Sequence, residues 1–361
     1  MKLLLLGDVC PTDHSWDAFA SANVEQLFGD TATLFERNDF NVINLECAIT
    51  DSDKGIDKFG PCLKAPYKTA ETLKKLGVDL IGLSNNHIFD FGKVGVRDTL
   101  QALSDVQLDY TGFGDNEEDS RKNYYVERNG QKICIIAVCE REYSYALPNR
   151  MGARVYDEYI TIEDVRAAKQ HCDRVIVLYH GGKEFCRYPS PRVYELMRAL
   201  VRNGADLVIG QHSHCIATYE NYQGGHILHG QGNFHFTKPF DFDGWFSCLA
   251  VEYDTVRNEV NFVPICADEE KIWLAKSEEK ETILTEFAQR NEQLQNGQWR
   301  NGWHEFCISM KADYLYWLSK AAAKDSTPRE DAVFGHYLDC QAHTDVWREL
   351  YPTFNQTNEL D

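Results

Sequence analysis

The sequence predicts an α/β fold in which short buried strands alternate with amphipathic helices. Short apolar runs recur along roughly the first 266 residues, with helix-like segments between them, as in sheets built mainly from parallel strands. Several of these runs stop directly on an acid, an amide or a histidine. Because open α/β sheets bind ligands beyond the carboxyl ends of their strands, the second observation also predicts a functional site at that edge.

The composition narrows the class of protein. The 361 residues suffice for one large domain or two ordinary ones, and a net charge of −19 argues against a nucleic-acid partner. A phosphorylated small substrate stays open, because bound metal ions would supply positive charge locally. The twelve cysteines are scattered, and the run from Leu3 to Leu6 is too short for a membrane span. We therefore expect a reduced, cytoplasmic protein with a small-molecule or peptide-like substrate and no membrane partner, of unknown oligomeric state.

The first two strands end on carboxylates. Lys2 to Leu6 leads into Asp8, with Cys10 two residues later on the same side. Asp8 fits a turn or helix cap as well as a metal ligand. Asn41 to Leu45 repeats the pattern and ends on Glu46. A carboxylate at the end of a buried strand needs a partner, and a metal ion is one such partner.

The third strand, Val78 to Leu83, is followed at once by Asn86 and His87. Asp90 lies three residues further, a spacing that suits a carboxylate orienting an imidazole. Alternatively, the polar residues of this stretch cap the next helix, Val94 to Ser104. The two roles are compatible.

Histidines end two later strands. Arg174 to Tyr179 stops on His180, and the next apolar run reaches Gly210, which we expect to let the backbone turn. His212 and His214 follow. On an extended segment, residues two apart share a face, so both imidazoles are expected to point into one site. A pair of structural histidines is the alternative.

The remaining elements follow from the same patterns, and the composition changes near residue 266. Beyond that point charged, helix-like segments replace the strand signals, so we expect a domain over 1–266 and a helical extension over 267–361. Further helices are expected over 16–35, 67–76, 162–171, 191–203, 271–295, 303–323 and 331–350, and further strands over 124–127, 132–139, 226–229, 245–253 and 259–264.

Together the strand ends carry more donors than one tetrahedral ion needs. The mixture of carboxylate, amide oxygen and imidazole fits two divalent first-row cations, of manganese, iron or zinc, with one acid bridging them. Such a pair activates a shared water and clamps the oxygens of a displacement. The predicted ligands are Asp8, Cys10, Glu46, Asn86, His180, His212 and His214.

The order of the motifs GD, NLE, SNNHxxDxG, a strand-end His-Gly, GADLVIGxHxH and GNF resembles the CapA family over about residues 1–265. That family is associated with poly-γ-glutamate capsule synthesis and belongs to the calcineurin-like metallophosphoesterase superfamily. The resemblance implies a four-layer α/β/β/α sandwich of the metallophosphoesterase type. It also implies that Glu46 bridges two metals, that Asp8 and His214 bind the first, and that the second takes the ligands Asn86, His180 and His212.

The resemblance further implies that His87 faces the substrate as a general acid or electrostatic stabiliser, with Asp90 holding its ring. One departure concerns Cys10, which stands where the superfamily's first motif has a histidine; a small buried thiol is the alternative to a ligand there. Lys64 lies in a loop that tends to be basic in the family. Four residues are candidates for substrate binding, with a solvated surface as the alternative for the cations: Lys64, Lys183, Arg187 and Asn233.

These features lead us to expect a metal-dependent hydrolase of the phosphoesterase type. A second possibility uses the same metals on a peptide or γ-glutamyl amide, by hydrolysis or epimerisation. A third is a non-catalytic assembly protein for a capsule or polyglutamate polymer, which the acidic net charge disfavours through Coulomb repulsion.

Overall fold

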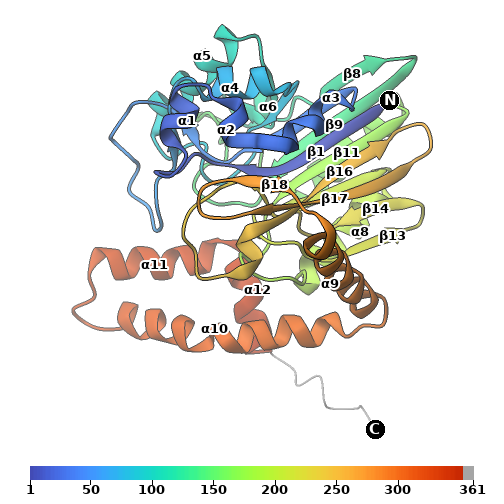
Figure 1. Ribbon diagram of the computed structural model, residues 1–361. Helices are drawn as coiled ribbons and strands as arrows, with labels where there is room; N and C mark the ends of the chain where they lie inside the picture. The colour runs from blue at the N-terminus through green and yellow to red at the C-terminus, as the bar shows by residue number, and fades with distance from the viewer. Residues whose placement is uncertain (353–361) are drawn as a thin grey trace.

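Two β-sheets face each other at the centre of the molecule in the computed structural model, which describes residues 1–352 (Figure 1). The first sheet has the strand order β18-β17-β16-β1-β2-β5-β6, with β15 pairing alongside β1. Its strands are β1 (Lys2–Val9), β2 (Phe40–Leu45), β5 (Leu80–Gly82), β6 (Asp109–Thr111), β15 (Asn233–His235), β16 (Ser247–Asp254), β17 (Glu259–Ala267) and β18 (Ile272–Leu274).

The second sheet has the order β13-β14-β12-β11-β9-β8, in which β9, β11, β12 and β14 are parallel. Its strands are β8 (Tyr124–Arg128), β9 (Gln131–Cys139), β11 (Arg174–His180), β12 (Leu207–Gln211), β13 (Tyr219–Tyr222) and β14 (Gly225–Leu228). Two short pairs lie outside the sheets: β3 (Ala48–Ile49) with β4 (Lys64–Ala65), and β7 (Phe113–Gly114) with β10 (Gly152–Ala153).

Helices cover the outer face of each sheet. Over the first sheet lie α1 (Trp16–Ala20), α2 (Val24–Phe28), α3 (Thr33–Glu36), α4 (Thr69–Leu76) and α5 (Gly92–Asp105), whose apolar faces meet Leu4, Ile43 and Ile81. Over the second lie α7 (Glu158–Lys169) and α8 (Pro191–Arg202). The short α6 (Glu117–Ser120) packs beside β7 and β10.

The expected four-layer α/β/β/α sandwich is therefore present. The central layer of side chains comes from the inner faces of both sheets, including Leu5 of β1 and Ile176 of β11. Because each sheet is covered on both faces, strands such as β1 are buried along nearly their whole length, which explains why they appear in the sequence as continuous apolar runs.

The helical extension consists of α9 (Ser277–Gln295), α10 (Trp299–Ala321), α11 (Pro328–Asp339) and α12 (Gln341–Leu350). Helix α9 closes one end of the interface between the sheets, where Phe287 packs on Tyr219 and Phe262. The other three lie below the sandwich in Figure 1 and share a separate apolar core around Trp303 and Tyr314.

Three expected elements differ from the structure. The single helix predicted over 16–35 is broken into α1, α2 and α3, because Ala22 (φ 53°) and Gly29 (φ 46°) leave the helical region. The helix predicted to begin at residue 271 starts at Ser277, since β18 first extends the sheet beyond residue 266. The helix predicted over 331–350 is interrupted at Cys340, whose ψ is 126°.

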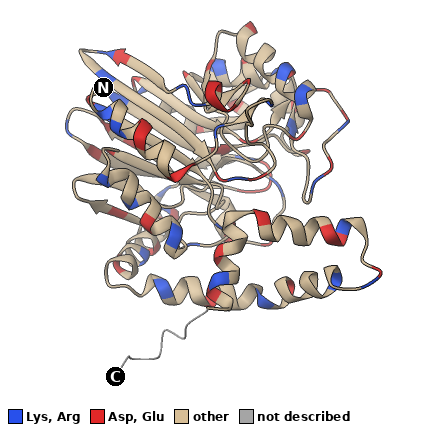
Figure 2. Cartoon of the chain, turned by 180° about the vertical axis from the view of Figure 1, so that it is seen from behind, with Lys and Arg blue, Asp and Glu red and all other residues tan. Residues whose placement is uncertain are grey.

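Charged side chains of both signs are interspersed over the surface, including the C-terminal helices (Figure 2). Across residues 1–352, none of the helices combines the length and the apolar character that crossing a bilayer requires.

Candidate metal centre

Five of the predicted ligands meet where the two sheets present the carboxyl ends of their strands. Two groups of potential ligand atoms are found here, and Glu46 belongs to both. Within each group, the atoms lie within 4.8 Å of one another. The first group joins Glu46 to Asp8 and His180, and the second joins it to His212 and His214. His214 Nδ1 also lies 3.7 Å from Asp8 Oδ2, so the five side chains form one continuous cluster, called here the sheet-end cluster.

Glu46 is the centre of the sheet-end cluster. Its side chain is 0% exposed, and within residues 1–352 neither carboxylate oxygen has a hydrogen-bond partner. His180 Nε2 lies 3.3 Å from Glu46 Oε1, and His214 Nε2 and His212 Nδ1 lie 3.9 and 4.0 Å from the same oxygen. Burial, and then the charge of Asp8, raises the pKa of Glu46 well above its usual value. Such a carboxylate is costly without a cation.

Two of the three histidines have the protonation state that a metal site needs. Burial lowers the pKa of His180 to about 4 and that of His212 well below its usual value. Both imidazoles are therefore neutral near pH 7, the form in which imidazole binds metals. Burial opposes protonation of His214 as well, but Glu46 and Asp8 outweigh it and raise the pKa of His214.

Two asparagines, Asn86 and Asn44, lie beside the sheet-end cluster. The Oδ1 atom of Asn86 lies 3.0 Å from His180 Nε2, so this predicted ligand is at the cluster. Asn44 was not predicted, yet its amide donates to Asp8 Oδ1 at 2.7 Å and lies 3.3 Å from His180 Nδ1. Its position two residues before Glu46, on the same side of β2, was the available signal in the sequence.

His212 and His214 converge by a route other than the predicted one. Both have left-handed backbone conformations, with φ of 74° and 53°, and lie beyond the end of β12 rather than on an extended segment. Their ring centroids are 5.9 Å apart. Left-handed conformations cost non-glycine residues on the order of 1–2 kcal/mol each, so this turn holds local strain at the site.

Close backbone approach, rather than turning, explains the glycines of two motifs. Gly210 lies inside β12, so the expectation that it serves as a turn is wrong. A Cβ on Gly210 would lie 2.2 Å from the carbonyl oxygen of His229. A Cβ on Gly7 would lie 2.0 Å from the carbonyl oxygen of Gly232. The absence of that Cβ lets β15 pair with β1, and Asn233 Oδ1 then lies 2.8 Å from His214 Nδ1.

Cys10 lies outside every group of three or more potential ligand atoms found in residues 1–352. Its thiol donates to the carbonyl of Pro11 at 3.5 Å. Burial, and then the neighbouring Cys47 thiol, raises the pKa of Cys10 well above its usual value. Its position outside these groups and its contact with Pro11 favour the buried-thiol alternative for Cys10.

Two charged residues, Asp90 and Lys58, contact the Nδ1 atom of His87. Its Nδ1 atom lies 2.6 Å from Asp90 Oδ2, the contact that their spacing predicts. Lys58, which we did not predict, lies 3.2 Å from the same Nδ1 and donates to Asp90 Oδ1 at 2.5 Å. Its side chain is only 2% exposed, although it follows a largely exposed charged loop. Asp90 also accepts from the backbone N–H of Leu63 at 2.7 Å.

The Lys58–Asp90 pair gives a testable expectation about stability. Asp90→Asn leaves a buried ammonium without its carboxylate, so we expect a loss of about 3–5 kcal/mol in the free energy of unfolding. Adding Lys58→Met to Asp90→Asn should recover most of that loss. Denaturant unfolding of the two single variants and the double variant measures the coupling. Additive losses would contradict the pairing.

The predicted substrate cations differ in position. Lys64 donates to Asp53 at 2.8 Å and to the carbonyl of Ser52 at 3.0 Å. Lys183 is buried and lies 3.1 Å from Glu184. Burial opposes ionisation of Glu184, but the charges of Lys183, His212 and His214 outweigh it and hold the pKa of Glu184 well below its usual value. Lys183 therefore lies near the sheet-end cluster.

Two further cations complete the surroundings. Arg187 pairs with Asp243 at 2.7 Å. Lys238, which we did not predict, lies 4.4 Å from the centre of the Trp245 ring, and that ring packs on His214 with centroids 4.9 Å apart. Lys238 is thus a cation near the cluster.

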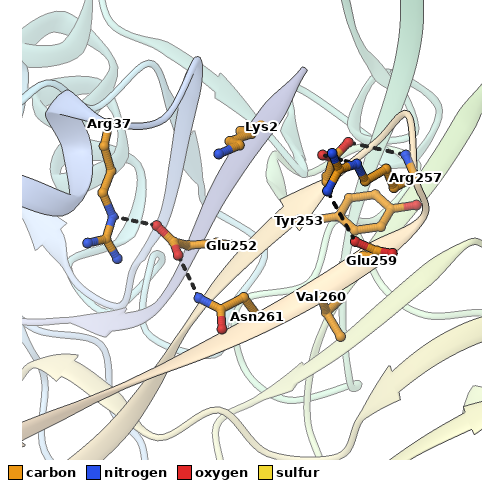
Figure 3. A pocket seen from close by; sticks show the side chains of 9 residues that line it. Lys2, Arg37, Glu252, Tyr253, Arg257, Glu259, Val260 and Asn261 are labelled. Atoms are coloured by element: carbon orange, nitrogen blue, oxygen red, sulfur yellow. Dashed lines mark hydrogen bonds and ion pairs between the residues drawn. The ribbon is translucent and has the colours of Figure 1, made fainter.

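A surface hollow of about 340 Å³ lies elsewhere, along β1, β16 and β17 (Figure 3). Four of its charged residues are paired: Arg37 with Glu252 at 2.7 Å, and Arg257 with Glu259 at 3.9 Å. Asn261 also donates to Glu252 at 2.8 Å. These contacts among the lining residues give a structural role to the charged side chains of the hollow.

The loop after β9 also supports the site from within. Ser144 is buried; its hydroxyl donates to the carbonyl of Asn86 at 2.6 Å and accepts from the backbone N–H of Phe89 at 3.2 Å. The extension is anchored nearby, because Asp345 of α12 accepts from Ser190 at 2.6 Å and pairs with Arg192 at 2.9 Å. Arg192 in turn pairs with Glu140.

Comparison with known proteins agrees with these features. The family model described as "Bacterial capsule synthesis protein PGA_cap" matches residues 2–238. The capsule biosynthesis protein CapA of Bacillus anthracis is 27% identical over 68% of this chain and 61% of its own length. The PGA biosynthesis protein CapA of Bacillus subtilis is 28% identical over 66% of this chain and 63% of its own. The chain thus spans about three fifths of the length of these relatives.

Among solved structures, a putative 5'-nucleotidase from Staphylococcus aureus aligns with a TM-score of 0.44 and 14% identity, over 80% of this chain and 58% of its own. The fold and cluster define an α/β/β/α protein whose buried histidines and carboxylates are compatible with divalent metals. The chain belongs to the bacterial capsule synthesis protein PGA_cap family, which includes the CapA-like proteins.

Proposed function

We propose that this protein is a metal-dependent hydrolase of the phosphoesterase type and that the sheet-end cluster is its active site. The observation that carries the proposal is Glu46, a fully buried carboxylate whose two oxygens lack hydrogen-bond partners in residues 1–352 while three imidazoles surround it. Such an arrangement suits a carboxylate shared by two cations. Asp8, His180, His212 and His214 would complete the ligand set, with Asn86 adjoining His180. Manganese, iron and zinc suit these donors.

The residues around the cluster have separate roles in this proposal. Bound divalent ions would supply Lewis acidity and activate a water molecule. His87 adjoins Asn86 in the same loop and would assist the leaving oxygen, since Asp90 and Lys58 hold its Nδ1 side and leave Nε2 for the substrate. Lys183 would attract an anionic group of the substrate.

The relatives' names favour a second candidate. Two of them are described as capsule or PGA biosynthesis proteins, which directs attention to peptide-like material. The same cluster would then polarise a γ-glutamyl or peptide carbonyl for hydrolysis or epimerisation. A non-catalytic role in assembling such a polymer is the remaining alternative for this family.

Turnover by the reconstituted protein separates these candidates. The full chain is freed of metal, reconstituted with manganese, iron or zinc in turn, and offered aryl phosphodiesters, phosphomonoesters, γ-glutamyl peptides and α-peptides. We expect metal-dependent turnover of a phosphoester that His212→Ala abolishes while circular dichroism is unchanged. Turnover of γ-glutamyl substrates alone would favour the second candidate, a metal-dependent enzyme acting on a γ-glutamyl or peptide amide. Two bound metals with no turnover at all would favour the assembly role.

A further inference from the structure

The helical extension contains a second group of potential metal ligands. His336 lies in the last turn of α11, Cys340 connects the two helices, and His343 lies in the first turn of α12. Each contributes one ligand atom, and the three atoms lie within 4.8 Å of one another. We propose that these three residues bind a zinc ion, with Glu142 as the fourth ligand.

The helix break at Cys340 is what brings the three side chains together. In an unbroken helix, residues seven apart are separated by about 10.5 Å along the axis, too far to share one ion. Here the chain turns between α11 and α12, so the ring centroids of His336 and His343 are only 4.9 Å apart (Figure 1). Ligand atoms of a tetrahedral zinc site lie about 3.3–3.8 Å apart, so adjustments of about 1 Å would complete the geometry.

Neighbouring side chains orient both imidazoles. The Tyr314 hydroxyl lies 2.5 Å from His343 Nδ1, which leaves Nε2 as the ligand atom. Tyr314 is itself fully buried in the apolar core of the extension. The Tyr143 ring stacks on His336 with centroids 5.0 Å apart. The Tyr314 contact is of the kind that commonly fixes a metal-binding histidine through its other ring nitrogen.

The chemistry of the group fits zinc. Cys340 is 4% and His343 7% exposed, so the site is sheltered from water. Glu142 Oε1 lies 3.5 Å from His336 Nε2 and supplies a carboxylate from the loop after β9. A zinc ion with one thiolate and one carboxylate forms a neutral centre, which suits a buried position. The neighbouring Lys183 is already paired with Glu184.

The proposed zinc would connect two parts of the chain. Glu142 precedes Ser144, whose hydroxyl supports the carbonyl of Asn86 in the sheet-end cluster. The ion would therefore pin α11 and α12 to the loop that shapes the proposed active site. The inference does not depend on which reaction that site performs.

A thiolate ligand makes this centre distinguishable from the sheet-end cluster, whose donors are oxygen and nitrogen. A cobalt–thiolate bond gives an intense near-ultraviolet charge-transfer absorption that carboxylate and imidazole ligands lack. The full chain is freed of metal, kept reduced and titrated with Co²⁺, and zinc in the protein as purified is measured by elemental analysis. We expect the charge-transfer band and about one zinc ion per chain attributable to this site.

Matched cysteine variants assign the band. Cys340→Ser should abolish it and lower the zinc content by about one ion per chain, whereas Cys10→Ser should leave both unchanged. His336→Gln changes a partly exposed ligand and should weaken cobalt binding at least tenfold even if Cys340→Ser folds poorly. Absence of the band in the native chain would overturn the proposal. So would a band lost in Cys10→Ser and kept in Cys340→Ser. Turnover by the sheet-end cluster is scored separately.

Discussion

Replacing Glu46 by glutamine is expected to affect stability in opposite directions with and without divalent metal. In the metal-free protein, Glu46→Gln should unfold at the same temperature as the native chain or a higher one. Burial and the charge of Asp8 raise the pKa of Glu46, so its ionised form is costly there. Glutamine has nearly the same shape and removes that charge, so the cost disappears.

With metal present the order should reverse. A ligand that binds only the folded state stabilises it by about 2.7 kcal/mol at a free concentration one hundred times its Kd. The native chain should gain this stabilisation in full. Glu46→Gln loses the shared carboxylate, so its metal affinity should fall. Loss of an outer-shell partner costs roughly 10–100-fold in metal affinity, and we expect a larger fall here. Thermal unfolding in chelator and in saturating Mn²⁺ or Zn²⁺ measures both effects.

Glu252→Gln is the matched control for this experiment. Glu252 is a carboxylate away from the sheet-end cluster: it is partly buried and pairs with Arg37 in the hollow along β16. Its substitution should change the unfolding temperature equally in both conditions. If Glu46→Gln likewise shifted the unfolding temperature by the same amount with and without metal, Glu46 would not be a metal ligand.

His87→Gln is expected to retain metal and lose most turnover. His87 lies beside Asn86, and its Nδ1 atom contacts Asp90 at 2.6 Å, so its remaining nitrogen is the one available to substrate. A positioned acid–base group of this kind contributes about 10²–10⁴-fold to the rate. We expect a fall of that size in kcat on the best substrate, with metal content unchanged.

The exposed His171 provides the control, because His171→Gln makes the same chemical change away from the site. Metal content and unfolding temperature should match the native chain in both variants. Full activity of His87→Gln would show that another group supplies the proton. Loss of metal together with activity would instead place His87 among the ligands. Asp90→Asn is less informative about catalysis, because it also removes the partner of Lys58.

The strands and most of the sheet-end cluster were predictable because their signals are local. Burial on both faces produces continuous apolar runs, and the residue type that ends each run is visible at once. Asp8, Glu46 and His180 therefore needed no knowledge of their partners. The turn at His212 and His214 was not predictable in the same way, since two left-handed residues replace the extended backbone that the spacing suggested.

Other features depend on partners far apart in the chain. Lys58 becomes a buried ion-pair partner only because Asp90, 32 residues away, folds beneath it. Gly210 needs to be glycine because the backbone at His229, just after β14, passes close to it, which no pattern around Gly210 reveals. The helix break at Cys340 was also not predictable from local signals. The helical pattern of the sequence continues over 331–350, but the backbone leaves the helical conformation at Cys340.

The sequence by itself determined the alternation of buried strands and helices, the family and the strand-end donors. These follow from hydrophobic burial and from side-chain chemistry that each short segment carries alone. Tertiary structure alone decided that Glu46 is shared between two groups of ligands and that Lys58 contacts His87. It also decided that His336, Cys340 and His343 meet, and that His336 contacts Glu142. Those contacts join segments distant in the chain, and only packing of the complete fold brings such segments within reach.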